Sequence, residues 1–581
     1  MYKQLAKSIR QYKKASIKAP CFVFLEVLME CIIPFIIAQL VNQIKAGCSF
    51  STILQYGFAL LILAGLSLTF GALAGIEAAT ASSGFARNLR KDIFYKIQDF
   101  SFENIDKFSS SSLVTRLTTD ITNVQNAYMM IVRIAIRSPL LFVFSFTMAI
   151  IMGGKMALIF LLVVPILGLG LFWVAHKVMP LFKSVFKKYD ALNNSVQENI
   201  QGMRVVKSYV REDYEKKKFE AAVQNVCADF TRAEKILAIN NPLMQFCLYV
   251  VMVFVLSFGS YTIITSRGMD LDVGQFSALL TYSFQILNSL MMLSMVFVMI
   301  TMASESAHRI VEVLSEESTL TSPENGVLEV KDGSIDFDHV SFKYSKKAER
   351  MALSDIDLHI KSGETIGVIG GTGSSKSSLI QMISRLYDTT EGTVKVGGRD
   401  VREYDLEALR NQVAVVLQKN VLFSGTIKEN LRWGNKDATD KEMMEACRLA
   451  QADEFIQRFP DKYDTYIEQG GSNVSGGQKQ RLCIARALLK KPKVLILDDS
   501  TSAVDTKTDA LIRKAFKEFI PDTTKIIIAQ RTSSVEDADR IIVMDGGRIS
   551  AIGTHEELLK SSEIYREVYT SQNKAGDEDA R

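Results

Sequence analysis

A chain of 581 residues is too long for one hydrophobic core, so it predicts several domains. A net charge of +4 is too small to indicate nucleic acid as a partner, and 48% hydrophobic residues is high for a water-soluble protein of this length. The seven cysteines form no CxxC pair and show no metal-like spacing, which indicates free thiols rather than a disulfide framework.

The first part of the chain predicts a membrane domain. Residues 1–16 are polar and basic and predict an amphipathic segment, and the apolar run after them is too long for a cleaved leader, so no signal peptide is expected. Residues 17–310 then contain six apolar stretches, and a membrane-spanning helix needs roughly 20 such residues. The stretches lie at about Ala19–Val41, Ile53–Ala81, Ala127–Met152, Met156–Val178, Ile239–Thr265 and Val273–Ala303.

The connections between these stretches alternate in character. Three are short and carry little charge, whereas Arg87–Gln125 and Lys177–Lys235 are long, polar and rich in lysine and arginine. The positive-inside rule therefore predicts that both long connections and both termini lie in the cytoplasm. We expect their inner segments, Ser112–Asp120 and Asn199–Glu212, to contact a cytosolic domain.

Charged residues inside the predicted spans leave two interpretations open. Glu26 and Glu30 lie four residues apart in the first span, and Arg133 and Arg137 do so in the third. Charges at this depth are costly and usually face a cavity or a partner. They indicate either an acidic patch that accepts cationic substrates or glutamate–arginine pairs within the bundle. The sixth span also repeats methionines at helical spacing, which suit either adaptable apolar binding or an ordinary span; they are Met291, Met295, Met299 and Met302.

Composition changes after the last span. Residues 311–333 are rich in Glu, Ser, Thr, Pro and Gly and predict a linker. From 334 to 571, short β-rich runs alternate with helical patterns, as in an α/β domain with an antiparallel edge. Residues 572–581 are polar and predict a flexible tail.

A glycine-rich turn lies between the expected strand Thr365–Ile369 and an amphipathic helix, which is the context that a phosphate-binding loop requires. Backbone N–H groups would bind phosphate oxygens, Lys376 adds a positive charge, and the Ser377 hydroxyl would ligate Mg²⁺. Ser375 stands where the usual pattern has glycine, which leaves its effect on nucleotide affinity open. The predicted ATP-binding residues here are Gly370, Gly371, Thr372, Gly373, Ser374, Ser375, Lys376, Ser377 and Ser378.

Later motifs follow this loop in order. Residues Val474–Gln478 read VSGGQ, and the apolar run Val494–Leu497 precedes Asp498 and Asp499. With six spans ahead of them, these motifs make the whole chain resemble an ATP-binding cassette (ABC) exporter half-transporter of the multidrug type. The expected fold class is therefore an α-helical membrane domain with six transmembrane helices plus an α/β P-loop NTPase (ABC ATPase) domain.

The resemblance implies roles for single residues. Tyr344 resembles the aromatic that stacks on adenine, Asp498 the carboxylate that holds Mg²⁺ through water, and Gln418 the loop glutamine that touches Mg²⁺ and the membrane helices. Residues 468–471 are similar to the exporter-specific segment, and Asp505 lies in the loop that crosses the dimer interface. The signature residues expected to contact a partner's ATP are Ser475, Gly476, Gly477 and Gln478.

Two positions that should carry hydrolysis depart from the family pattern. Asp499 stands where a glutamate orients or activates the attacking water, and its carboxylate falls short by about one C–C bond. Misplacement on that scale can cost about a hundredfold in rate. Gln530 stands at the switch-histidine position; it can hydrogen-bond a γ-phosphate but cannot carry a proton charge. These departures imply a degenerate-site subunit that pairs with a second half-transporter whose catalytic Glu and His are intact.

The expected function is ATP-driven export of amphipathic or lipophilic small molecules across the plasma (inner) membrane, by analogy a bacterial one, with ATP and Mg²⁺ as cofactors. Its own site would hydrolyse weakly, and its signature would complete the partner's catalytic site. The alternatives are a lipid flippase, a peptide, siderophore- or thiol-linked exporter, a working homodimer, and a regulatory subunit that transports nothing. The spans exclude a soluble ABC ATPase, and both domains on one chain disfavour an importer.

Overall fold

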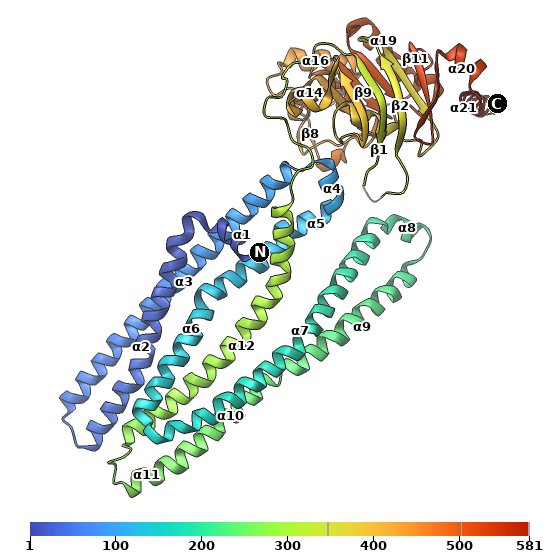
Figure 1. Cartoon of the computed structure of the whole chain (residues 1–581). Coiled ribbons are helices and arrows are strands. Elements are labelled where there is room, and N and C mark those ends of the chain that lie inside the picture. The colour runs from blue at the N-terminus through green and yellow to red at the C-terminus, as the bar shows by residue number, and fades with distance from the viewer. Residues whose placement is uncertain (346–347, 501, 579–581) are drawn as a thin grey trace. The chain divides into compact units, whose positions relative to one another are not determined.

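The computed structural model describes residues 1–345, 348–500 and 502–578, and the chain forms two compact units (Figure 1). The helical unit comprises Met1–Asp99 and Phe108–Glu316. The α/β unit comprises the short segment Phe100–Lys107 and the chain from Glu317 onward.

Long helices build the helical unit. Among the described residues, five continuous helical runs are long and apolar enough to cross a membrane. One of these runs, Ser110–Phe182, holds two of the six predicted spans, because the turn η3 (Gly154–Ala157) joins two helices within it. The main helices are α2 (Lys13–Lys45), α3 (Phe50–Gln98), α6 (Ile121–Gly153), α7 (Leu158–Gln201), α9 (Glu212–Leu237), α10 (Asn240–Phe254), α11 (Ser260–Thr265) and α12 (Val273–Ser315).

Shorter elements complete this unit, and local chemistry sets several helix ends. Ser49 caps α3 through the Thr52 N–H (3.3 Å), and Asp272 begins α12 with a capping box. Gly154 reverses the chain after α6 with a φ of 50°, which glycine adopts without a side-chain clash. The shorter elements are α1 (Tyr2–Ala6), η1 (Lys7–Tyr12), α5 (Ser110–Thr115), η2 (Arg116–Asp120), α8 (Met203–Ser208) and η4 (Val255–Gly259). Helix α4 (Phe102–Phe108) lies almost wholly in the segment that belongs to the α/β unit.

The inner segment of the first long connection, Ser112–Asp120, packs within the helical unit. Its contact with the cytosolic domain stays a prediction. Asp120 is fully buried and accepts hydrogen bonds from Ser306 (2.8 Å) and Arg309 (2.9 Å). The reason is physical: a buried carboxylate needs such partners, and the last turns of α12 supply them.

The segment that joins the α/β unit lies earlier in the chain. Within that unit, Tyr387 donates a hydrogen bond to Asp106 (2.6 Å), and the Phe102 and Tyr387 ring centroids are 6.1 Å apart. Asn104 donates to the Glu317 carbonyl (3.1 Å). Residues Phe100–Lys107 are therefore fixed to the α/β unit by one acidic, one aromatic and one amide side chain.

The strands of the α/β unit form two larger sheets and a two-stranded ribbon among the described residues. The four-stranded sheet has the order β2-β1-β4-β5 and the six-stranded sheet the order β12-β11-β3-β10-β9-β6. Their bounds are β1 (Ile335–Phe342), β2 (Leu353–Ile360), β3 (Thr365–Gly370), β4 (Glu391–Val396), β5 (Arg399–Asp400), β6 (Val413–Val416), β7 (Gly425–Thr426), β8 (Tyr466–Ile467), β9 (Val494–Asp498), β10 (Thr524–Ile528), β11 (Arg540–Asp545) and β12 (Arg548–Gly553).

Strands β3, β9, β10 and β11 of the six-stranded sheet are buried on both faces, which explains their long apolar runs. Along β9, Ile496 joins the core toward the four-stranded sheet, while its neighbour Leu497 joins the core beneath the helices. Strands β3 and β9 both pair in parallel with β10, which lies between them. The loops that follow these three strands therefore meet at one edge, where open α/β sheets bind ligands.

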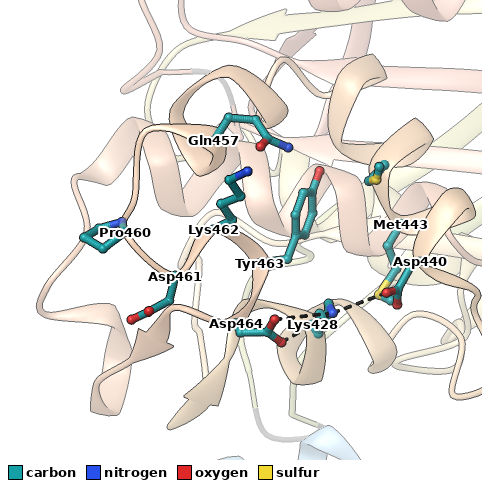
Figure 2. Close-up of a pocket in the computed structure, with 10 residues that line it drawn as sticks. Lys428, Asp440, Met443, Gln457, Pro460, Asp461, Lys462, Tyr463 and Asp464 are labelled. Atoms are coloured by element: carbon teal, nitrogen blue, oxygen red, sulfur yellow. Dashed lines mark hydrogen bonds and ion pairs between the residues drawn. The ribbon is translucent and has the colours of Figure 1, made fainter.

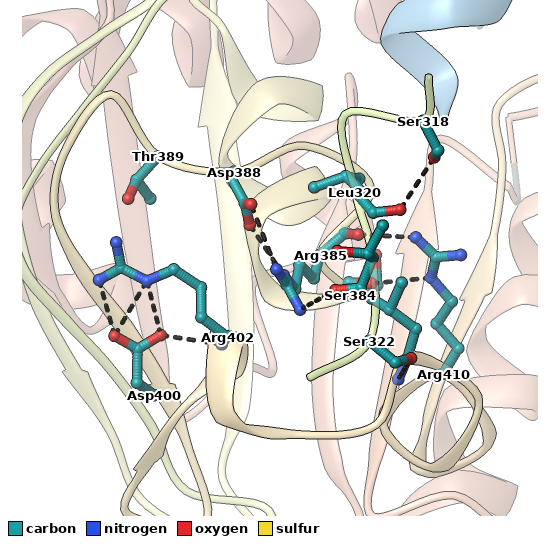
Figure 3. Close-up of polar contacts among 12 residues, drawn as sticks. Ser318, Leu320, Ser322, Ser384, Arg385, Asp388, Thr389, Asp400, Arg402 and Arg410 are labelled. Atoms are coloured by element: carbon teal, nitrogen blue, oxygen red, sulfur yellow. Dashed lines mark hydrogen bonds and ion pairs between the residues drawn. The ribbon is translucent and has the colours of Figure 1, made fainter. Parts of the chain in front are cut away.

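Helices cover this sheet, and the linker lies against the end of one of them. In Figure 3, Arg385 donates to the Thr321 carbonyl (3.4 Å) and pairs with Asp388 (2.8 Å), and Arg410 donates to the Arg385 carbonyl (2.7 Å). The first residues of the predicted linker, 311–315, therefore belong to α12. Further along, its Thr321 carbonyl contacts Arg385 of the α/β unit. The helices are α13 (Lys376–Ile383), α14 (Leu406–Gln412), α15 (Ile427–Arg432), α16 (Asp440–Leu449), α17 (Asp453–Gln457), α18 (Gly476–Leu488), α19 (Thr506–Phe519), α20 (His555–Ser561) and α21 (Glu563–Glu578).

The predicted tail at 572–581 is helical in its described part. Helix α21 continues through Glu578, and residues 579–581 lie outside the described residues. The polar composition of the segment did not indicate this helix. The contacts that hold α21 come from a few side chains on one of its faces. Tyr565 is fully buried, and the Gln572 side chain hydrogen-bonds the loop after β10.

Candidate nucleotide site

The predicted phosphate loop joins β3 to α13. A Cβ atom on Gly371 or Gly373 would meet nothing within 4 Å, so the loop has open space on one side. A Cβ on Gly370 would instead lie 2.3 Å from the Met544 carbonyl, so this glycine permits close packing on β11. Lys376 folds back and donates to the Gly370 and Gly371 carbonyls at 2.8 and 2.9 Å. The loop thus has the form of an anion cradle with its own lysine in it.

Ser375 adopts the left-handed conformation, with a φ of 71° and a ψ of 26°. This conformation costs a non-glycine residue roughly 1–2 kcal/mol. The serine at the usual glycine position therefore keeps the left-handed backbone at the expense of strain.

The magnesium side of the site lies at the end of β9. Ser377 donates to Asp498 (3.2 Å), and Asp498 is only 6% exposed. Burial raises the pKa of Asp498, opposed by the Ser377 hydrogen bond, and burial lowers the pKa of Lys376, opposed by the nearby aspartates. A hydroxyl and a carboxylate oxygen are donors that suit Mg²⁺, which binds through one or two carboxylates plus substrate phosphates. Among the described residues no larger metal-binding cluster is found.

The structure brings Asp499, Gln530 and Gln418 together. We call Asp499 and Gln530 the water side of the site, because Asp499 stands where the residue that acts on the attacking water is expected. Gln530 donates from Nε2 to Asp499 Oδ2 at 2.8 Å. Burial raises the pKa of Asp499, and hydrogen bonds from Gln418 and Gln530 oppose that rise. Asp499 itself has a φ of 49°, an unusual backbone for a non-glycine residue. The sequence predicted Asp499 at the attacking water and Gln530 at the γ-phosphate, but not the hydrogen bond between the two side chains.

The predicted adenine side is an aromatic cluster. Tyr344 is 44% exposed, and its hydroxyl contacts Ser378 Oγ (2.8 Å) and donates to Gln381 (3.0 Å). Its ring stands edge-on to Phe342 and Tyr387, with centroids 4.8 and 5.2 Å away. Sequence reasoning missed Tyr387, which also holds Asp106; the aromatic just after α13 was the available signal.

The signature forms a helix N-terminus. Ser475 caps α18 by accepting from the Gln478 N–H (3.3 Å), and Gln478 in turn accepts from the Ser475 N–H (2.9 Å). Gly476 is exposed, and a Cβ on Gly477 would lie 2.8 Å from the Ala503 carbonyl. Asp505 caps α19 through the Thr508 N–H (3.0 Å). No hydrogen bond or ion pair given for the described residues joins this signature to the P-loop of the same chain.

One arginine of the third predicted span pairs with both glutamates of the first. Arg137 contacts Glu30 at 2.7 Å and Glu26 at 3.4 Å. These contacts favour the pairing interpretation over a free acidic patch. Of the methionines proposed to line a cavity, Met295 is exposed, while Met291 and Met299 are half-buried on α12.

A separate cavity of about 590 Å³ lies beside α16 (Figure 2). In it, Lys428 bridges Asp440 (3.3 Å) and Asp464 (3.4 Å). None of the residues that line it belongs to the predicted nucleotide site. It therefore plays no part in the phosphate chemistry described above.

Comparisons with known proteins place the chain among membrane transporters. The family model "ABC transporter transmembrane region" matches residues 17–290, and the family model "ABC transporter" matches residues 353–502. The uncharacterized ABC transporter ATP-binding protein YfiB of Bacillus subtilis is 36% identical over 547 residues, which cover 94% of each chain. An uncharacterized ABC transporter ATP-binding protein of Mycobacterium tuberculosis is 34% identical over 574 residues, which cover 98% of each.

A solved structure shares the whole fold. The structure of a bacterial Atm1-family ABC exporter with ATP bound superimposes with a TM-score of 0.83 at 23% identity, over 97% of this chain and 98% of that one. The fold class predicted from the sequence is thereby confirmed, and the donor groups at the carboxyl edge of the sheet fit MgATP. The chain belongs to the ABC transporter family, with its membrane-spanning region and its MgATP-using domain on one polypeptide.

Proposed function

We propose that this chain is the degenerate-site subunit of a heterodimeric ATP-driven exporter. It binds MgATP at its own weakly hydrolytic site and supplies its signature to the catalytic site of a second half-transporter. The observation that supports this most is the contact between Asp499 and Gln530, the two residues that depart from the family pattern at positions expected to carry hydrolysis.

The phosphate side has what binding requires. Lys376 leaves the loop carbonyls and pairs with phosphate oxygens, exchanging neutral acceptors for charged ones, which form stronger hydrogen bonds. Ser377 and Asp498 already lie in contact and would hold Mg²⁺ between loop and strand. Tyr344 offers its exposed ring face to the base. Magnesium supplies charge neutralisation at the phosphates when it is bound.

The water side is less suited to hydrolysis. The short side chain of Asp499 accepts a hydrogen bond from Gln530, so each group satisfies the other instead of a water and a phosphate. Gln530 can still donate an amide N–H to a phosphate oxygen, but it cannot become a cation as charge develops there. These two residues therefore hold the site closed around ATP better than they promote the attack of water.

Exposed surfaces support pairing with a second chain. Ser475 and Gly476 are exposed at a helix N-terminus, where anions bind well. At the inner turn of the second long connection, Val205, Tyr209 and Val210 are 59%, 74% and 82% exposed. Apolar residues so exposed at one tip fit a docking surface on another chain.

Substrate class and orientation are part of the same proposal. Arg137 contacts both Glu26 and Glu30, so neither carboxylate is left without a cation, and an apolar groove of about 440 Å³ is lined by Pro20, Cys21, Phe24, Leu25 and Leu140. We therefore propose amphipathic or lipophilic cargo, moved outward across the plasma membrane of a bacterium, with both termini in the cytoplasm. The same groove favours lipid as the second candidate cargo, because acyl chains would fit its wholly apolar lining.

Nucleotide retention tests the proposal. The chain would be co-purified with a half-transporter that carries the catalytic Glu and the switch His, incubated with Mg²⁺ and 8-azido-ATP, and photolabelled. Mass spectrometry of labelled peptides then reads the phosphate count on each chain. We expect triphosphate on this chain and diphosphate on the partner. Diphosphate on both chains from the first turnover would refute the degenerate site.

A further inference from the structure

Helix α21 reaches the nucleotide site through one side chain. Gln572 Oε1 accepts hydrogen bonds from the Thr532 N–H (2.9 Å) and the Thr532 hydroxyl (3.0 Å). Gln572 Nε2 donates to the Gln530 carbonyl (2.7 Å). The side-chain amide of Gln572 thus hydrogen-bonds the loop after β10 at two residues, one on each side of Arg531.

The loop that Gln572 holds contains Gln530, the residue at the switch position. The backbone of Gln530 is held by Gln572, and the side chain of Gln530 reaches Asp499 at 2.8 Å. Just before it, the Ala529 N–H donates to the Val368 carbonyl (3.3 Å), so the loop is also fixed to β3. Removing Gln572 would release one end of this short segment while the strand end stays fixed.

Helix α21 is itself firmly placed. Tyr565 is fully buried, and its hydroxyl contacts His555 Nδ1 at 2.7 Å. The His555 and Tyr569 ring centroids are 5.2 Å apart. Tyr565, Tyr569 and Gln572 follow the spacing i, i+4, i+7, so they share one face of the helix. The two tyrosines anchor this face on α20, and Gln572 lies one turn beyond them.

We propose that Gln572 is a positioning residue for Gln530, and that helix α21 thereby sets the preference of this site for ATP over ADP. The inference rests on the proposed function in one respect, namely that Gln530 faces the γ-phosphate. Gln530 would contact a group that ADP lacks, so a loosened loop weakens ATP binding and leaves ADP binding unchanged.

The test is equilibrium binding to the full chain in lipid nanodiscs with Mg²⁺. Affinities for ATPγS and for ADP would be measured for the native chain, Gln572→Ala, Gln572→Glu and the control Ser571→Ala, an exposed neighbour on the same helix. We expect Gln572→Ala to weaken ATPγS about fivefold, the scale of one hydrogen bond, with ADP unchanged. Gln572→Glu keeps the acceptor for Thr532 but loses the donor to the Gln530 carbonyl, so it should fall at or below the alanine variant.

A double substitution separates positioning from plain stability. In a Gln530→Ala background the side chain that Gln572 would position is gone, so Gln572→Ala should have no further effect on the ATPγS to ADP ratio. An equal loss for both nucleotides, or a loss that persists in this background, would overturn the positioning role. A native chain that binds no ATPγS would refute the proposed function itself, whereas normal ATP preference in Gln572→Ala would refute only this inference.

Discussion

The two sides of the nucleotide site are built differently. The phosphate side rests on the backbone between β3 and α13 and on one contact to a β9 carboxylate, Ser377 to Asp498. The water side rests on two side chains from separate loops, Asp499 and Gln530, that bond to each other. Binding can therefore survive changes that impair hydrolysis, because the backbone cradle does not depend on the two altered residues.

The largest expected effect lies on the phosphate side. Lys376→Ala should weaken ATPγS binding by about ten- to a hundredfold, as expected for the loss of a charged hydrogen bond of about 1.5–3 kcal/mol. Isothermal titration on the full chain measures it, with the exposed Lys361→Ala as a charge-matched control. Unchanged affinity in Lys376→Ala would mean that nucleotide binds elsewhere.

The second effect tests the water side. Asp499→Glu combined with Gln530→His should raise ATP hydrolysis at this chain's own site by up to about a hundredfold. The longer carboxylate would reach the attacking water, and the histidine could carry a proton at the γ-phosphate. Phosphate release from the full chain measures the gain. Adding Lys376→Ala to the double variant must abolish this gain in hydrolysis. A double variant no faster than the native chain would show that Asp499 and Gln530 do not limit the rate.

The third effect concerns the base, which both nucleotides share. Tyr344→Ala should weaken ATPγS and ADP alike by about tenfold, since stacking on an aromatic ring is worth about 1–3 kcal/mol per base. Tyr344→Phe keeps the ring and loses only the contacts to Ser378 and Gln381, so its affinities should stay close to native. A loss confined to ATPγS would contradict the assignment of Tyr344 to adenine.

The smallest effect concerns strain in the phosphate loop. Ser375→Gly relieves a left-handed serine and should stabilise the nucleotide-free α/β unit by about 1 kcal/mol. A thermal shift assay without nucleotide measures it, and Ser384→Gly, at the other end of α13 with a φ of −87°, should instead destabilise. A lower melting temperature in Ser375→Gly would show that its hydroxyl contributes more than the strain costs.

The sequence predicted the elements that follow local patterns. The apolar stretches, the P-loop between strand and helix, and the carboxylates after β9 are all read from neighbouring residues. The contacts that were missed join residues far apart in the chain: Tyr387 with Asp106, Arg309 with Asp120, and Gln572 with Gln530. No periodicity predicts these partners, since they depend on how helices and loops pack.

The polar stretch after Thr570 gave no sign of the last of these contacts. It predicts a flexible tail, and its residue Gln572 hydrogen-bonds a loop that precedes it by about forty positions. The available signal was the spacing of Tyr565, Tyr569 and Gln572 on one helical face. Polar residues that complete a site cannot be told from solvent-exposed ones until the fold brings the site together.

The most direct test of the central claim is steady-state ATP hydrolysis by this chain alone, beside the same chain co-expressed with a half-transporter that carries the catalytic Glu and the switch His. The account predicts near-zero turnover alone and strong turnover of the pair, little changed by Asp499→Asn. Substantial turnover by the chain alone that Asp499→Asn abolishes would contradict it, and would show a homodimer in which aspartate serves as the catalytic carboxylate.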